Sequence, residues 1–272
     1  MGKFYLLPLF ILPVLANAES TKPIRIPFTL ENDLPTVSAK IDGVTRKLFI
    51  DSGGFAFLTL TKAALEQTPV TFNGHHVRQR DISGQEFEIR DFSAKEIQAG
   101  EMTAFNIDGY EIIHSTAAGD FTQDGYLGFG AISRSISVFD YPHSELRLYP
   151  PSTPANELVA ECGGTQFELK IDGGVMESIV QTEKGPLIFQ WDTGSTQNVL
   201  RPSALNLSGN LPTSQPFSKF VVGHMDEGRI RIPLREFAAP NVDGVLGTPF
   251  FRGKVVCFDP AHGRGWLRKP KQ

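Results

Sequence analysis

Cysteine is scarce in this chain, with two in 272 residues. Neither Cys162 nor Cys257 has the neighbours expected of a catalytic thiol or a zinc ligand, so cysteine chemistry is not indicated. Two interpretations of the pair remain open. In an oxidising compartment the two can form a disulfide, and otherwise they are small buried thiols on strands.

Long apolar runs and basic blocks are missing as well. The apolar run from Phe4 to Leu15 is too short to span a bilayer, so we expect no stable membrane insertion. A net charge of −4 without a basic block argues against nucleic acid as a partner. The motifs of serine hydrolases, zinc peptidases and phosphate loops are absent, and the six histidines are scattered. We therefore expect no metal and no cofactor.

The first residues have the pattern of an export signal. A short basic start precedes the apolar run, and Ala16-Asn17-Ala18 is a small-x-small cleavage pattern. No cysteine follows the run, so a lipoprotein anchor has no attachment point. We expect residues 1–18 to be a signal peptide and the protein to be exported, periplasmic or secreted. An uncleaved membrane anchor is the alternative.

Helical patterns are scarce, and the sequence favours β structure. The chain has 21 Phe, 26 Gly and 19 Pro, and its short apolar runs are separated by turn residues. Alternation at 87–90 and 229–232 predicts half-buried strands. Short helices are expected at 61–67 and 202–207, and nothing supports a parallel βαβ sheet.

What the chain does have is an internal duplication. Asp-Gly-Tyr-Leu-Gly at 124–128 and Asp-Gly-Val-Leu-Gly at 243–247 align at an offset of 119 residues, without gaps to the end of each half. Lys-Ile-Asp-Gly also occurs twice, at 40–43 and 170–173. A proline-rich stretch separates the halves. We predict an N-terminal lobe over 19–148, a linker over 149–157 and a C-terminal lobe over 158–272.

Each half carries an acid–hydroxyl–glycine tripeptide after a short apolar run. The tripeptides are Asp51-Ser52-Gly53 and Asp192-Thr193-Gly194. Taken singly, each is an ordinary turn sequence. At the same point of a repeat, they indicate two carboxylates that face each other. Two close carboxylates cannot both ionise cheaply, so they share a proton, which suits acid–base chemistry.

Together these motifs resemble the pepsin/retropepsin-like aspartic proteases, in the bacterial-type secreted form with both lobes in one chain. The resemblance covers nearly all of the chain after the export signal and rests on 48–54, 124–128, 189–195 and 243–247. It implies a mostly β fold of two similar six-stranded, barrel-like lobes with a cleft between them. It also implies a monomeric endopeptidase that hydrolyses a peptide or protein substrate.

The resemblance assigns roles to named residues. Asp51 and Asp192 would be the catalytic dyad, and a hairpin with Ser83 and Gly84 at its tip would be the flap, or else an ordinary surface hairpin. The supporting residues of the two acid loops would be Ser52, Gly53, Thr193, Gly194 and Ser195. The elements that pass behind these loops in a ψ-shaped crossing would be Leu127-Gly128 and Leu246-Gly247.

Some positions depart from the family pattern. Gly54 stands where a hydroxyl residue or alanine is usual, whereas Ser195 keeps the hydroxyl in the second half. Gln190 and Trp191 replace smaller apolar residues, which is either tolerated or reshapes the site. No tyrosine is available for the flap before Tyr110. We expect an asymmetric dyad with the altered pKa on Asp51. The alternative function is a catalytically inactive, protease-like binding protein of the cell envelope.

Overall fold

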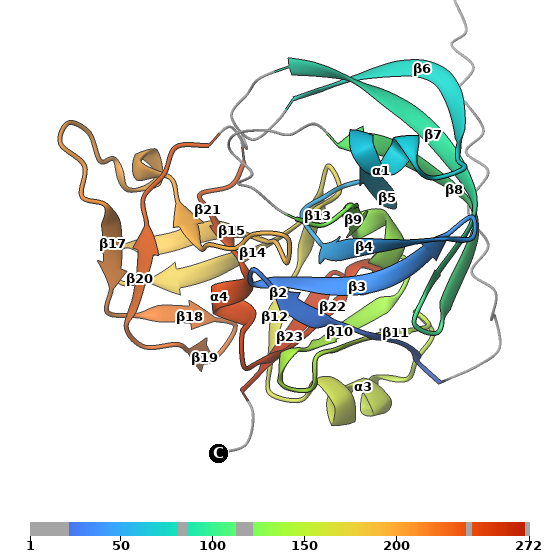
Figure 1. Ribbon diagram of the computed structural model, residues 1–272. Helices are drawn as coiled ribbons and strands as arrows, with labels where there is room; N and C mark the ends of the chain where they lie inside the picture. The colour runs from blue at the N-terminus through green and yellow to red at the C-terminus, as the bar shows by residue number, and fades with distance from the viewer. Residues whose placement is uncertain (1–21, 81–85, 113–121, 238–240, 270–272) are drawn as a thin grey trace, which may run out of the picture.

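The computed structural model describes residues 22–80, 86–112, 122–237 and 241–269, so the predicted signal peptide lies outside it. The protein is mostly β and consists of two lobes beside each other (Figure 1). No helix in these ranges is long and apolar enough to cross a membrane. The helices are α1 (Lys62–Glu66), α2 (Phe129–Ile132), α3 (Ala155–Cys162) and α4 (Thr248–Phe251), with 3-10 turns η1 (Tyr141–His143), η2 (Pro202–Leu205) and η3 (Pro260–His262).

The N-terminal lobe is built around a closed barrel. Its strands are β2 (Thr29–Glu31), β3 (Leu34–Ile41), β4 (Val44–Asp51), β5 (Leu58–Thr61), β6 (Thr71–Arg80), β7 (Glu86–Ala99), β8 (Met102–Ile112) and β9 (Gly125–Gly128). They pair in the order β2-β3-β4-β9-β5-β8-β7-β6. Because β3 also pairs with β7, placing Ala39 opposite Ala99, the six strands from β3 to β7 in this order form a closed ring.

The C-terminal lobe repeats part of this arrangement with shorter strands. They are β13 (Lys170–Asp172), β14 (Val175–Thr182), β15 (Gly185–Trp191), β16 (Val199–Leu200), β18 (Phe220–Val222), β19 (Met225–Asp226) and β21 (Gly244–Leu246). The order is β16-β21-β15-β14-β18-β19, with β13 beside β14. A separate pair is formed by β17 (Ser214–Phe217) and β20 (Ile230–Pro233). Across the described residues, strand pairing leaves this lobe open.

A third sheet is shared by the two halves. Its strands are β1 (Ile24–Pro27), β10 (Ile136–Asp140), β11 (Glu145–Tyr149), β12 (Thr165–Glu168), β22 (Val255–Asp259) and β23 (Arg264–Arg268), in the order β1-β11-β10-β22-β23-β12. The central strands β10 and β22 are buried along their whole length, because residues of this sheet pack into a core on each of its faces. The closing strand pair of each half therefore binds the lobes together.

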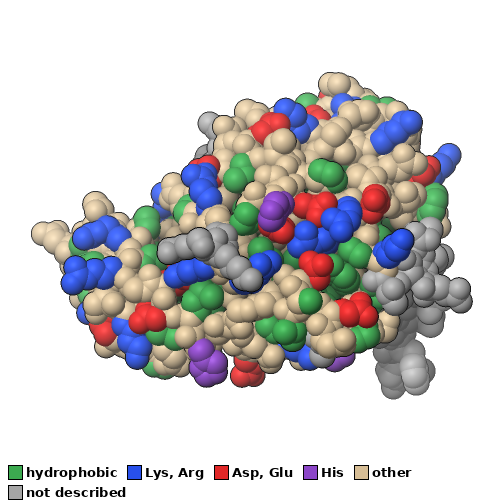
Figure 2. All heavy atoms as spheres, turned by 90° about the horizontal axis from the view of Figure 1, so that it is seen from below, with side chains coloured by type: hydrophobic (Ala, Val, Ile, Leu, Met, Phe, Trp, Pro, Cys, Tyr) green, Lys and Arg blue, Asp and Glu red, His purple; other side chains and the backbone are tan. Residues whose placement is uncertain are grey.

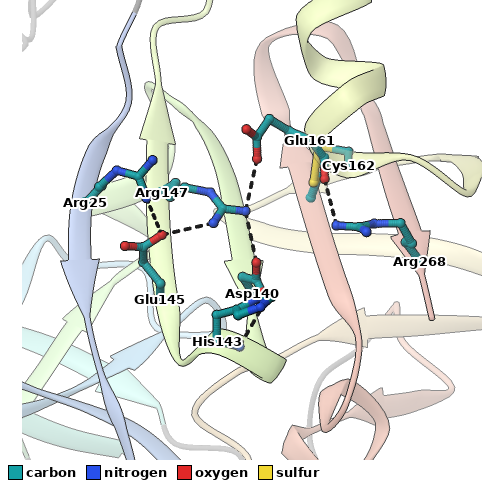
Figure 3. Close-up of polar contacts among 9 residues, drawn as sticks. Arg25, Asp140, His143, Glu145, Arg147, Glu161, Cys162 and Arg268 are labelled. Carbon is teal, nitrogen blue, oxygen red and sulfur yellow. Dashed lines mark hydrogen bonds and ion pairs between the residues drawn. A yellow bond between two sulfur atoms is a disulfide. The ribbon is translucent and has the colours of Figure 1, made fainter. Parts of the chain in front are cut away.

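The shared sheet has a core on each face. On one face Phe139 and Phe258 meet edge to face, with ring centroids 6.0 Å apart, inside the main core. On the other face α3 packs its Leu158 into a smaller core. A disulfide joins Cys162 at the end of α3 to Cys257 in β22 (Figure 3). The two cysteines are therefore bonded, which decides between the two interpretations of the sequence.

Ion pairs fasten α3 to the same face (Figure 3). The buried guanidinium of Arg147 contacts Asp140 at 3.1 Å, Glu145 at 3.0 Å and Glu161 of α3 at 3.1 Å. Although burial of Asp140 opposes it, the hydrogen bonds from His143 and the charge of Arg147 lower the pKa of Asp140. This network is therefore strongest when its carboxylates are ionised.

The two short helices and the linker predicted from the sequence lie close to the observed elements. The short helices predicted at 61–67 and 202–207 are confirmed as α1 and η2. The predicted linker begins at Tyr149, but Tyr149 still pairs within β11, so the irregular segment begins one residue later. Helix α3 then begins at Ala155, so residues 150–154 alone connect strand and helix.

Candidate active site

The two acid loops lie opposite each other where the lobes meet. Asp51 ends β4 and Asp192 follows β15, and their carboxyl groups are hydrogen-bonded to each other. Each acid-bearing strand pairs in parallel with the Leu-Gly element of its own half. Asp51 lies opposite Gly128 of β9, and the residue before Asp192 lies opposite Leu246 of β21.

Ser52 and Thr193 cross-link the loops through buried hydroxyls. Ser52 Oγ donates to the carbonyl oxygen of Trp191 (2.8 Å) and accepts from the N–H of Thr193 (3.0 Å). Thr193 Oγ1 donates to the carbonyl oxygen of Ile50 (2.8 Å) and accepts from the N–H of Ser52 (2.9 Å). These four bonds fix one loop relative to the other, as the family resemblance implies.

The tripeptide glycines stand against the opposite carboxyl groups. A Cβ on Gly53 would lie 2.6 Å from Cγ of Asp192, and a Cβ on Gly194 would lie 2.5 Å from Cγ of Asp51. Both distances are too short for any side chain. The absence of side chains at these two positions is therefore what allows the carboxyl groups to approach.

The glycines of the Leu-Gly elements press against the loops from behind. A Cβ on Gly128 would meet the carbonyl oxygen of Gly54 at 2.5 Å, and one on Gly247 would meet that of Ser195 at 2.5 Å. The N–H of Thr248 donates to the same Ser195 oxygen at 2.9 Å. Leu127 and Leu246, which precede the glycines, are buried in the core. These residues support the loops from the interior of each lobe.

Both carboxyl groups accept backbone hydrogen bonds from their own loops. Asp51 Oδ1 accepts from the N–H groups of Gly53 and Gly54, each at 2.9 Å. Asp192 Oδ1 accepts from the N–H of Gly194 at 2.9 Å, and the backbone of Ser195 also hydrogen-bonds to the Asp192 carboxyl group. Burial raises the pKa of both groups, and the Asp51 charge raises that of Asp192 further, to well above its ordinary value. The two carboxyl groups therefore share one proton, and the larger rise in pKa is on Asp192.

The asymmetry is only partly the one expected from the sequence: the pKa of Asp51 is raised, as expected, but that of Asp192 is raised further. The expectation placed the altered pKa on Asp51 because Gly54 lacks a hydroxyl and Ser195 keeps one. In the structure Ser195 Oγ donates to the carbonyl oxygen of Gln197 at 2.7 Å. The backbones of Gly54 and Ser195 hydrogen-bond to their own acids alike. The larger shift is on Asp192 because burial and then the Asp51 charge raise its pKa.

Trp191 and Gln190 lie on opposite faces of β15. The Trp191 indole is fully buried, stacks on Phe167 with centroids 4.6 Å apart, and donates to Ser178 Oγ at 2.8 Å. It therefore belongs to the core and leaves the site unobstructed. Gln190 turns to the other face, with Nε2 2.7 Å from the place where a Gly53 Cβ would lie. Its amide thus reaches the opposite acid loop.

Gln190 and Tyr126 are site residues whose roles the sequence did not reveal. Tyr126 lies on β9 with its ring against Gly54. A signal was present in both cases, since each residue interrupts the repeat. Gln190 corresponds to Phe49 and Tyr126 corresponds to Val245. At each of these positions the other half has an apolar residue. The amide of Gln190 and the hydroxyl-bearing ring of Tyr126 therefore indicated a local difference near the acids.

The candidate flap residues Ser83 and Gly84 lie outside the described residues. The strands on either side, β6 and β7, form an antiparallel hairpin whose described pairs extend to Arg80 opposite Glu86. Tyr110, the first tyrosine after the first acid loop, lies on β8 and packs its ring on Phe55, with centroids 5.4 Å apart. An aromatic pair therefore follows the first acid loop.

The described residues contain no group of three or more side chains suited to a metal ion. His75 and His76 on β6 are exposed, and His75 Nδ1 lies 3.2 Å from a carboxylate oxygen of Asp91. On the face seen in Figure 2, acidic and basic side chains are interspersed instead of forming a patch of one sign. This distribution does not suit a polyanionic partner on that face.

Comparison with known proteins shows the fold. No protein-family model matches the chain, and no curated protein matches it in sequence. Among solved structures, the aspartic proteinase from Irpex lacteus superposes with a TM-score of 0.60 at 12% identity, covering 90% of this chain and 96% of that one. The chain thus has the bilobal β fold of an aspartic proteinase.

Two seed globulins share the same fold. Conglutin gamma, a basic 7S globulin from lupine, gives a TM-score of 0.56 at 10% identity, covering 93% of this chain and 96% of that one. Basic 7S globulin from soybean gives 0.53 at 11% identity, covering 92% and 95%. Because all three identities are low, these similarities define an architecture, and the chemistry must be argued from the site.

Proposed function

We propose that this protein is an aspartic endopeptidase with Asp51 and Asp192 as its dyad. The observation that carries the proposal is the hydrogen-bonded pair of carboxyl groups between two loops that Ser52 and Thr193 lock together. Purely structural turns would not need two carboxyl groups in contact, since burying a pair of acids raises the free energy of the folded state.

The order of ionisation assigns the two acids different tasks. A water held between them attacks the peptide carbonyl carbon while ionised Asp51 takes a proton from it. Protonated Asp192 donates its proton to the carbonyl oxygen. The resulting diol then collapses: Asp51 returns its proton to the leaving nitrogen, the C–N bond breaks, and Asp192 recovers its proton. The pair ends in the state in which it began, without any cofactor.

A monomer that takes an extended peptide fits this arrangement. Both acids belong to one chain, so a second copy is unnecessary for the site. We keep the β6–β7 hairpin as the flap, because a strand-like substrate can pair with an extended hairpin. The disulfide between Cys162 and Cys257 supports export to an oxidising compartment, periplasmic or extracellular.

The test is cleavage of a mixed peptide library from acid to neutral pH, with and without pepstatin. Asp51→Asn and Asp192→Asn should each abolish cleavage while the variants stay folded. Asp108→Asn is the matched control, because Asp108 is an exposed acid on β8. Cleavage that survives either dyad substitution contradicts the proposal.

A protease-like binding protein without activity is the second candidate. It is favoured by the similarity to two seed globulins, whose names denote no proteinase. The position of Trp191 in the core removes one reason for it, since the indole does not obstruct the acids. A folded protein that cleaves nothing across the pH range, yet retains a peptide whose binding depends on Asp51, would favour this candidate.

A further inference from the structure

The two lobes differ in a coordinated way beside their acids. The residue after the tripeptide is Gly54 in the first lobe and Ser195 in the second. The residue before the Leu-Gly element is Tyr126 in β9 and Val245 in β21. The lobe that lacks a side chain at the first position therefore has the large ring at the second, which suggests that one replaces the other.

The geometry shows that the ring and a residue-54 side chain compete for one volume. A Cβ at Gly54 would lie 2.6 Å from Cε2 of Tyr126 and 2.9 Å from Oδ2 of Asp51. The backbone of Gly54 is fixed, because its N–H donates to Asp51 at 2.9 Å and its carbonyl oxygen accepts from the N–H of Phe129 at 2.5 Å. The loop cannot shift to admit a side chain.

The ring is held in place from the sheet. Tyr126 lies between Phe49 of β4 and Thr59 of β5, and its ring centroid is 5.4 Å from that of Phe49. These neighbours carry no titratable group. The charged groups that act on it are Asp51 and Asp192; burial first, and then these charges, raise the pKa of Tyr126, so its hydroxyl remains protonated where the dyad titrates.

We propose that Tyr126 is a positioning residue of the dyad, whose ring takes the place of the side chain missing at Gly54 and shields the Gly54 side of the Asp51 carboxyl group from bulk solvent. This inference rests on the proposed function of the dyad and adds a local cause for the burial of Asp51. Loss of the ring would hydrate Asp51, so that this acid would ionise at lower pH.

The first test is a packing exchange measured by thermal unfolding, which needs no activity. Gly54→Ser should lower the Tm by at least about 5 °C in the parent protein and by less than about 2 °C in the Tyr126→Val background, which carries the second lobe's pair of residues. Equal losses in both backgrounds would overturn the shared-volume argument.

The second test is the titration of the Asp51 carboxyl carbon by NMR. In Tyr126→Val this titration should move to lower pH by at least about 0.5 unit, and in Tyr126→Phe, which keeps the ring, by less than about 0.2 unit. Tyr149→Val is the control, because Tyr149 is a buried tyrosine of the shared sheet. It should lower the Tm without moving the Asp51 titration.

The two proposals fail in different ways. If the parent cleaves no peptide while the Asp51 titration moves in Tyr126→Val, the inference about Tyr126 is supported and the endopeptidase proposal is contradicted. If the parent cleaves peptides and the Asp51 titration is the same in the parent and in Tyr126→Val, the role of Tyr126 is overturned and the peptidase stands. In an active parent, the acid limb of kcat/KM should follow the Asp51 titration.

Discussion

The two lobes repeat one frame but stabilise it differently. The N-terminal lobe closes its barrel by pairing β3 with β7. The C-terminal lobe stays open across its described strands, and a disulfide spanning 95 residues ties its final strands to α3. Backbone pairing thus closes the first lobe, whereas the cross-link of the second half holds α3 on the shared sheet and restricts the unfolded chain.

Around the acids the lobes agree where geometry is strict and differ where it is not. The glycine and hydroxyl positions match, because each glycine faces a carboxyl group and each hydroxyl makes two bonds across the interface. The next shell differs: Tyr126 lies beside the Asp51 loop where the second lobe has Val245, and the larger rise in pKa is on Asp192. The repeated frame thus sets the positions of the two acids, and the residues that differ between the lobes give the acids different environments.

The largest expected effect on activity is that of alanine at either tripeptide glycine. Gly53→Ala and Gly194→Ala should each lower kcat/KM by more than about 100-fold, since the new Cβ would push the opposite carboxyl group aside. Each should also cost about 1–3 kcal/mol of stability. Gly43→Ala, at a turn glycine with open space around it and a φ of +90°, should cost stability through backbone strain and keep full activity. Unequal losses at the two glycines would contradict the symmetry.

Removal of the disulfide tests the difference in how the lobes are held. The double change Cys162→Ser and Cys257→Ser should lower the free energy of unfolding by about 4 kcal/mol, given the long loop that the bond closes. Denaturant titration measures this loss, and reductant should reproduce it in the parent protein. A variant as stable as the parent would show that the packing of α3 on the shared sheet needs no cross-link.

The hydroxyl cross-links should be of equal value in the two lobes. Ser52→Ala and Thr193→Val each remove a donor and an acceptor and leave a buried carbonyl oxygen unpaired, so each should cost about 1–3 kcal/mol. Thermal unfolding gives the values, and the double variant should show coupling because the bonds share one interface. A loss of stability at only one of the two positions would contradict the equal value of the two hydroxyls.

The pH dependence of stability should have opposite signs at two buried acids. Asp192 has a raised pKa in the folded state, so its favourable contribution is complete at low pH and is lost as the pH rises. Asp192→Asn should therefore stabilise the protein at pH 7, by at least about 1 kcal/mol. Asp140 has a lowered pKa. Its contribution is lost as the pH falls, so Asp140→Asn should destabilise at pH 7 and matter less in acid.

The meeting of the two acid loops could be predicted from the sequence because the duplication repeats each motif in both halves. The two tripeptides and the two Leu-Gly elements predicted which segments meet, and Asp51, Ser52, Asp192 and Thr193 do meet. The shared sheet was not foreseen. The closing strands at 136–149 and 255–268 look alike in each half, and nothing local indicates that they pair across the halves.

The proton's location could not be predicted either. It depends on the burial of the two carboxyl groups and on the Asp51 charge beside Asp192. The cysteines were undecided for the same reason, since spacing alone does not bring Cys162 and Cys257 together. These outcomes are set by tertiary contacts, which local sequence does not encode.

The most direct measurement is the titration of both dyad carboxyl carbons in the unaltered protein by NMR. We predict two separate steps, both above the ordinary aspartate pKa, in which Asp51 ionises first and Asp192 releases the shared proton at higher pH. In Asp51→Asn the Asp192 step should move to lower pH, because the neighbouring charge is gone. Two independent titrations near the ordinary aspartate value, or the reverse order, would contradict this prediction.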